Sequence, residues 1–225
     1  MKRIAPIELS SLNNECYKRL KEMILEGELQ WGARIDVGQI AASFGISKFP
    51  VIKAVERLSL ENLVTIAPNR GTYVVNPTAE DVLEITEIRI MLEEYACRIT
   101  YEKLGVDLVS ELKRVESSHQ FTEETLNKSA FREFLNYDRS FHLVFIEGTG
   151  NNRLISYYNT IRSQVEVFRT KTFILPNAKE ALIEHHRLIE LLEARRLEDA
   201  IAALHHHLLQ VHQDTVVSMN AEIPG

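Results

Sequence analysis

Residues 40–75 read IAASFGISKFPVIKAVERLSLENLVTIAPNRGTYVV, two short helical patterns followed by two strand patterns. The first helical pattern runs to Phe44, Gly45 interrupts it, and a second begins at Ser47 and reaches Leu58. Ser47 is expected at the N-cap of the second helix, where its hydroxyl can accept a hydrogen bond from a free backbone N–H. Two helices joined by a short turn that contains Gly are typical of a helix-turn-helix.

The second helix is followed by a predicted β-hairpin. The β-rich runs Leu63–Ile66 and Thr72–Val75 flank the turn sequence PNRG, which places Arg70 at the tip. Helix, turn, helix and hairpin together predict a winged helix, which is a DNA-binding unit. We expect the charged DNA contacts to come from Lys48, Lys53 and Arg70, with Ser47 and Thr72 as lesser phosphate contacts.

The same stretch resembles the N-terminal domain of GntR-family transcription regulators, whose recognition segment reads roughly G-V-S-R-T-P-V-R-E-A-L. Here it reads GISKFPVIKAV, so the family's two arginines are replaced by Lys48 and Ile52 and its glutamate by Lys53. Arg reads guanine through a rigid bidentate fork that neither Lys nor Ile can supply. The resemblance therefore implies DNA binding, but the family's operator preference is not carried over.

Composition is that of an ordinary globular protein. The 225 residues are 45% hydrophobic and 26% charged, and no run approaches the roughly 20 apolar residues of a membrane span. We find no signal peptide and expect a cytoplasmic location without membrane contact. The cysteines, Cys16 and Cys97, lie far apart in helical patterns and are expected as buried thiols.

Charge is distributed unevenly along the chain. The net charge is −6, but residues 1–76 hold 10 Lys and Arg against 8 Asp and Glu, a balance of +2, whereas residues 77–225 hold 16 against 24, a balance of −8. An acidic second part is compatible with DNA contact by the first part.

The sequence predicts two domains. Pro77 disfavours helix in the residue before it, and Thr78 followed by Asp81 resembles a capping box, so the junction is placed at 76–78. We expect a winged helix-turn-helix over residues 8–76 and an all-α antiparallel bundle over residues 78–220. Residues 121–128 are expected to be a connection and Pro176 a break, and six helices are predicted near 82–104, 108–119, 131–146, 151–172, 178–195 and 197–218.

Four residues of the predicted bundle have the pattern of metal ligands. Asp138 and His142 are four residues apart on an apolar helical face, and His185 and His207 lie on apolar faces of the last two helices. The turn between those helices falls near Arg196, 11 residues from each histidine. At about 1.5 Å per residue both histidines are therefore at the same level, roughly 16 Å from the turn.

Three imidazoles and one carboxylate suit a divalent metal. Zn²⁺ is the ion we expect, with Ni²⁺, Mn²⁺ and Fe²⁺ as alternatives. His186, His205 and His206 fall on more exposed sides and are not expected to be ligands.

The second part also resembles the FadR C-terminal (FCD) type of effector-binding domain, found in one branch of the GntR family. Metal-binding members carry D-x3-H, a Glu-His pair and a His-Leu 22 residues further on, which match Asp138, His142, Glu184-His185 and His207-Leu208. The resemblance implies a homodimeric regulator, commonly a repressor of catabolic genes, with an organic acid or sugar acid as effector. A homodimer is expected to bind a palindromic operator. The candidate effector-binding residues are Arg89, Asn151 and Arg162, although Arg89 could equally form a structural ion pair with Glu93.

We therefore expect a ligand-responsive transcription regulator with no catalytic residues. Two alternatives stay open. One is a metalloenzyme that uses the His₃Asp site to activate water. The other is a constitutive DNA-binding dimer whose metal is purely structural.

Overall fold

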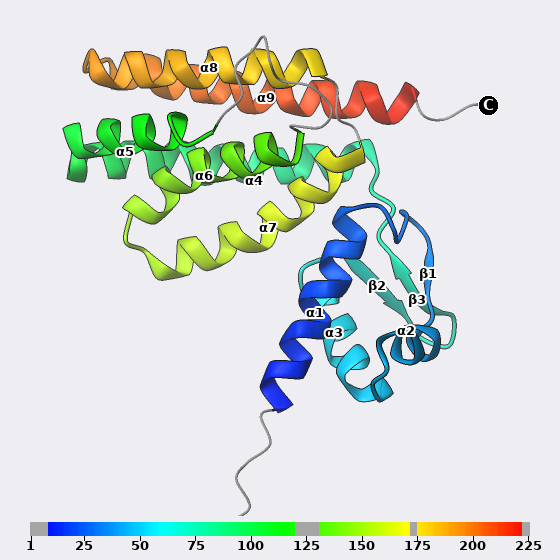
Figure 1. Cartoon of the computed structure of the whole chain (residues 1–225). Helices are drawn as coiled ribbons and strands as arrows, with labels where there is room; N and C mark the ends of the chain where they lie inside the picture. The colour runs from blue at the N-terminus through cyan, green and yellow to red at the C-terminus, as the bar shows by residue number, and fades with distance from the viewer. Residues whose placement is uncertain (1–8, 120–130, 172–174, 222–225) are drawn as a thin grey trace, which may run out of the picture. The chain divides into compact units, whose positions relative to one another are not determined.

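The computed structural model describes residues 9–119, 131–171 and 175–221. The chain divides after Pro77 into two compact units, and each is described by itself below (Figure 1). The expectation of a mostly helical chain with a small winged unit is confirmed. Among the described residues, no helix is long and apolar enough to cross a membrane.

The first unit is a winged helix. Its helices are α1 (Leu9–Leu25), α2 (Val37–Phe44) and α3 (Lys48–Leu60), and its strands are β1 (Arg34–Ile35), β2 (Val64–Ala67) and β3 (Gly71–Val74). The strands form an antiparallel sheet in the order β1-β3-β2. The β2–β3 hairpin is the predicted wing. The two-residue strand β1 was not predicted, because its pairing with Thr72 and Tyr73 leaves no pattern in so short a segment.

The helix-turn-helix begins at an unpredicted cap. Asp36 accepts hydrogen bonds from the backbone N–H groups of Gly38 and Gln39, at 2.8 and 3.0 Å, and so starts α2. Gly45 ends α2 in the left-handed conformation (φ 67°), as Gly commonly does. Ser47 occupies the N-cap position of α3, but its side chain makes no capping hydrogen bond, so that part of the prediction was wrong.

The buried face of α3 holds this unit together. Val51, Ala54, Val55 and Leu58 are almost completely buried, and α3 packs against α1, where Leu20 is also fully buried. The opposite face of α3 is consequently free of any role in the core.

The second unit contains six helices within the described residues. They are α4 (Ala79–Leu104), α5 (Val106–Glu116), α6 (Phe131–Gly148), α7 (Asn152–Lys171), α8 (Leu175–Glu193) and α9 (Leu197–Ala221). The predicted connection at 121–128 lies outside the described residues. Pro176 does not separate two helices but lies in the first turn of α8, where its missing N–H does no harm.

Helix α4 is the central element of the bundle, since α5, α6, α7 and α9 all pack against it. The predicted capping box starts it: the Thr78 side chain accepts from the Asp81 backbone, and the Asp81 carboxylate accepts from the Thr78 N–H. At the other end, Gly148 of α6 approaches Thr100 so closely that a Cβ at residue 148 would lie 2.2 Å from its methyl group. The Thr100 hydroxyl also donates to the Phe145 carbonyl, which fixes α6 against α4.

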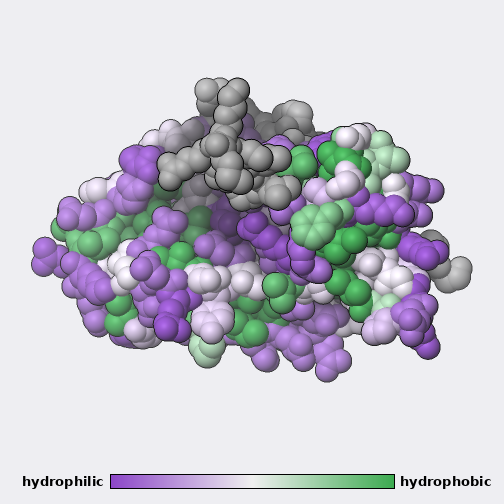
Figure 2. All heavy atoms as spheres, turned by 90° about the horizontal axis from the view of Figure 1, so that it is seen from below, coloured by the Kyte–Doolittle hydropathy of each residue, from purple (hydrophilic) through white to green (hydrophobic). Residues whose placement is uncertain are grey.

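Helices α8 and α9 lie side by side (Figure 1). A turn of three residues, 194–196, joins them, and Arg195 adopts a positive φ of 60° there. The apolar core beneath them includes Phe134, Phe141 and Phe145, all fully buried. On the face shown in Figure 2, hydrophobic residues are interspersed with hydrophilic ones, so a single exposed apolar side chain is unremarkable in this protein.

Candidate metal centre and nucleic-acid interface

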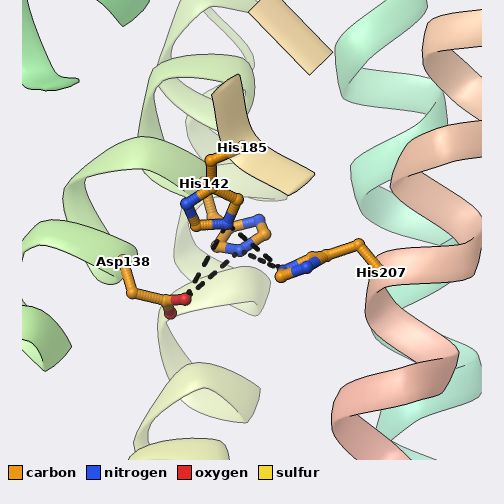
Figure 3. A group of neighbouring side chains, drawn as sticks. All are labelled: Asp138, His142, His185 and His207. Atoms are coloured by element: carbon orange, nitrogen blue, oxygen red, sulfur yellow. Dashed lines mark hydrogen bonds and ion pairs between the residues drawn. The ribbon is translucent and has the colours of Figure 1, made fainter. Parts of the chain in front are cut away.

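The four side chains predicted as metal ligands meet inside the helical bundle (Figure 3). Asp138 and His142 project from one face of α6 because they are one helical turn apart, His185 comes from α8 and His207 from α9. One potential ligand atom of each residue lies within 4.8 Å of those of the others. All four are buried, and the most exposed of them, Asp138, retains 4% of its accessible surface.

The Nε2 atoms of the three histidines converge. Nε2 of His207 lies 3.3 Å from Nε2 of His142 and 3.3 Å from Nε2 of His185. Asp138 Oδ1 lies 3.9 Å from Nε2 of both His142 and His185. Nitrogen ligands about 2.05 Å from a tetrahedral zinc ion would be roughly 3.3 Å apart, so the imidazole spacing fits one central ion.

Each histidine is oriented through its other nitrogen. Glu93 Oε2 lies 2.6 Å from Nδ1 of His142, and Glu184 Oε2 lies 2.7 Å from Nδ1 of His207. The hydroxyl of Tyr137 lies 3.1 Å from Nδ1 of His185. A parallel ring stack with Phe141, at 3.9 Å and 8°, fixes the plane of His185.

These outer contacts determine which nitrogens can bind a metal. A carboxylate can only accept, so the neutral rings of His142 and His207 must donate from Nδ1 and keep a lone pair on Nε2. Two such Nε2 atoms 3.3 Å apart cannot share a hydrogen bond, and their lone pairs repel. A divalent cation between them would convert the repulsion into coordination, and the outer carboxylates would make the imidazoles stronger ligands. The residues present therefore fit a zinc-type ion.

Glu93 is the centre of a buried ionic network. Arg89 Nε donates to its Oε1 at 2.7 Å, and the Tyr158 hydroxyl donates to the same oxygen at 2.9 Å. Burial alone would raise the pKa of this carboxyl, but the charge of Arg89 and the hydrogen bonds from Arg89 and His142 outweigh burial and hold the pKa of Glu93 at about 2. Burial lowers the pKa of His207, since the hydrogen bond to Glu184 offsets only part of the desolvation.

A small cavity adjoins the cluster. Its volume is about 20 Å³, room for roughly one water molecule. At its rim Glu166 of α7 lies between two arginines, with Oε1 3.4 Å from Arg139 Nε and 3.8 Å from Arg162 Nε. The lining residues are Arg89, Leu135, Asp138, Arg139, His142, Tyr158, Arg162, Val165 and Glu166.

The three candidate effector-binding residues are not all brought together. Arg89 and Arg162 both line the cavity, although Arg89 is already paired with Glu93. Asn151 does not line it: this residue is exposed and its Oδ1 accepts from the backbone N–H groups of Arg153 and Leu154 at the start of α7. Asn151 thus has the contacts of a helix cap.

Sequence reasoning predicted the cluster of Asp138, His142, His185 and His207 but not the groups that orient it. Glu93 was noted only as a partner of Arg89, and neither Glu184 nor Tyr137 was assigned a role. Glu184 precedes His185 by one residue and therefore points elsewhere on α8, so spacing alone gave no sign that it would meet His207 of α9. The exposed histidines make different contacts: His186 pairs with Glu116, His205 with Glu94 and His206 with Glu184.

The predicted DNA contacts all lie in the winged unit. Ser47, Lys48 and Lys53 are exposed around the first turns of α3, Arg70 is exposed between β2 and β3, and Thr72 is half-buried on β3. The ammonium group of Lys53 is 2.7 Å from the Glu56 carboxylate, so its charge is partly neutralised within the helix. The third basic side chain of α3, Arg57, stacks on Tyr17, with its guanidinium carbon 3.6 Å from the centre of the ring.

A winged helix joined to a bundle with a buried His₃Asp cluster defines a DNA-binding regulator. Residues 12–74 match the family described as bacterial regulatory proteins, gntR family, and residues 84–210 match the FCD domain. The chain therefore belongs to the GntR family of transcription regulators, in the branch with an FCD domain.

Relatives agree with this assignment. The chain is 28% identical over 200 residues to the HTH-type transcriptional regulator YdhC of Bacillus subtilis, covering 88% of this chain and 87% of that protein. It is 25% identical over 153 residues to the gluconate operon transcriptional repressor of the same organism, covering 66% and 60%. Both relatives are transcription regulators, which supports the regulator over the metalloenzyme alternative.

One solved structure bears on the metal cluster. The Zn²⁺-bound FCD domain of TM0439 is 26% identical to this chain, with a TM-score of 0.54, and the match covers 65% of this chain and 99% of that domain.

Proposed function

We propose that this protein is a metal-dependent, ligand-responsive transcription regulator. The winged helix, residues 8–76, binds operator DNA, and the bundle, residues 78–220, binds one divalent ion through Asp138, His142, His185 and His207. The convergence of the histidine Nε2 atoms carries the proposal, because the lone pairs of His142 and His207 face one another at 3.3 Å and Nε2 of His185 lies 3.3 Å from Nε2 of His207. The Zn²⁺-bound relative supports zinc as the ion, with nickel, manganese and iron as the other candidates.

The effector in this proposal is a small organic acid or sugar acid. Its carboxylate would reach the ion from the adjoining cavity, where Arg139 and Arg162 share the single carboxylate of Glu166 and retain an excess positive charge. Arg162 is therefore the strongest candidate for the effector's second contact. The similarity to a gluconate operon transcriptional repressor supports an acidic ligand and repression.

The size of the cavity suggests how the effector acts. Since about 20 Å³ holds one water molecule, the cavity must widen to admit an organic acid, and opening the Arg139–Glu166 contact between α6 and α7 would widen it. A ligand that binds the opened bundle better than the closed one shifts the population toward it. For the effector to regulate DNA binding, it must bind two arrangements of the bundle with different affinities.

The regulator is proposed to act as a homodimer on a palindromic operator. Ile88, Met91 and Tyr95 share one exposed face of α4, with Met91 63% exposed and Tyr95 52% exposed, which supports a self-complementary contact in the second unit. A two-fold dimer reads two half-sites related by the same symmetry.

Operator binding with and without metal and effector tests the proposal. Genomic fragments captured by the zinc-loaded protein would supply the operator, and fluorescence anisotropy would then measure its affinity during titration with small carboxylic and sugar acids. At least one acid should change the operator Kd in the loaded protein and not in the metal-free protein. If metal stabilises the bundle but no acid changes the operator Kd or shifts the melting temperature, the metal is structural and the regulator constitutive.

A further inference from the structure

Two large apolar side chains are exposed side by side at the start of α3. Phe49 is 54% exposed and Ile52 is 41% exposed. They are three residues apart, so they are neighbours on one face of the helix, opposite the buried face formed by Val51, Ala54 and Leu58. The fold does not require either side chain, since neither takes part in the core of the winged unit.

The surroundings of this pair are cationic. Lys48 precedes Phe49 and is exposed, and Lys53 follows Ile52, with its ammonium group 5.8 Å from the centre of the Phe49 ring. Glu56 is paired with Lys53, and Asp36, near Lys48, is engaged by the backbone N–H groups of Gly38 and Gln39. An apolar pair between two lysines fits a polyanion that also carries an apolar group better than it fits a protein surface.

Double-stranded DNA carries such a group. The second helix of a helix-turn-helix lies in the major groove, with its N-terminal residues against the base edges. Phe49 and Ile52 are the second and fifth residues of α3, so they belong to that N-terminal portion. Among the base edges of the major groove, the apolar group is the C5-methyl of thymine, and neither Phe nor Ile can use the hydrogen-bonding groups of the other bases.

We propose that Phe49 and Ile52 read thymine methyl groups in each operator half-site, while Lys48 and Lys53 hold the neighbouring phosphates. This inference rests on DNA binding by the winged helix and adds the chemistry of base recognition. It places a thymine opposite α3 in each half-site and makes operator affinity depend on its methyl group. Apolar contacts with base methyl groups would then supply most of the sequence specificity of α3, and ionic contacts with phosphates most of its affinity for DNA.

Replacing thymine by deoxyuridine tests the inference, because this removes the methyl group and leaves every hydrogen-bonding group of the base in place. Each thymine of a selected half-site would be replaced in turn, and the operator Kd measured by fluorescence anisotropy at fixed salt. The wild type should lose about fourfold in affinity at one or more positions, the factor expected for one buried methyl group. In Phe49→Ala or Ile52→Ala the same replacement should have no further effect.

Leu60→Ala is the matched control. Leu60 is 81% exposed at the other end of α3, so its removal should leave both the affinity and the methyl dependence at their wild-type values. The inference is overturned if no thymine shows methyl dependence, or if the dependence persists in both Phe49→Ala and Ile52→Ala. Failure of DNA binding itself would look different, since the wild type would then select no sequence at all.

Discussion

Replacing Glu93 with Gln removes one negative charge from the interior of the bundle at nearly constant volume. Glu93 is fully buried and accepts from Arg89, from Tyr158 and from Nδ1 of His142. The amide of Gln has one acceptor oxygen in place of two. If that oxygen keeps the contacts with Arg89 and Tyr158, its NH₂ group faces the Nδ1–H of His142, donor against donor.

The expected loss of metal affinity follows from this contact. Outer-shell partners of a metal-bound His are typically worth 10- to 100-fold in affinity, about 1.4–2.7 kcal/mol. His142 is one of four ligands, and the Glu93 contact at 2.6 Å fixes both its tautomer and its orientation. We therefore expect the zinc Kd of Glu93→Gln to rise by one to two powers of ten.

The metal-free protein should also lose stability. Breaking a buried ion pair by removing one partner costs about 3–5 kcal/mol, because the remaining charge is left uncompensated. Gln can still accept from Arg89, which places the expected loss near the lower value. At about 2–4 °C per kcal/mol, the melting temperature should fall by roughly 6–12 °C.

Glu94→Gln is the control for the same chemical change. Glu94 is the next residue of α4, and its partner His205, at 2.6 Å, is about half exposed, so the pair should contribute no more than about 1 kcal/mol. Competition with a chelating dye would give the zinc Kd, and calorimetry the melting temperature. The reasoning fails if Glu93→Gln keeps the wild-type zinc Kd, or if Glu94→Gln shows an equal loss.

Three further outcomes are expected. Lys48→Ala, Lys53→Ala and Arg70→Ala should each weaken operator binding and flatten its salt dependence by about one unit wherever the side chain neutralises a phosphate, and unchanged affinity in all three would contradict the interface. Metal should be released as pH falls below about 6 and retained as pH rises, because only neutral imidazole binds metal. Burial lowers the pKa of His207 and so favours its neutral form. Release of metal on raising the pH would contradict this prediction. Light scattering at micromolar concentration should give a dimer, and footprinting should show two half-sites about 34 Å apart or a multiple of that; a monomer on one half-site would refute the two-fold arrangement.

The winged helix and the convergence of the four candidate metal ligands could be predicted because both depend on local periodicity. Asp138 and His142 are one turn apart within α6, and the equal distance of His185 and His207 from the α8–α9 turn sets them at one level. Neither inference needs knowledge of how the other helices pack. The four side chains do lie together in the structure, where one atom of each is within 4.8 Å of the others.

The parts that escaped prediction depend on distant partners. Whether Ser47 or Asp36 caps a helix depends on side-chain torsions that sequence does not fix, and β1 exists only because β3 lies beside it. Glu93 reaches His142 from another helix, 49 residues away in the chain. Such contacts follow from the packing of α4 against α6 and not from any spacing within either helix.

Metal content of three proteins tests the central claim most directly. Elemental analysis would compare the wild type with His185→Ala and His186→Ala, two neighbours on α8 that differ in burial and position, with circular dichroism to show that each remains helical. His185 is fully buried in the cluster, whereas His186 is exposed and pairs with Glu116. The wild type and His186→Ala should each hold one divalent ion per chain, and His185→Ala should hold much less. Full metal in His185→Ala, or its loss in His186→Ala alone, would contradict the account.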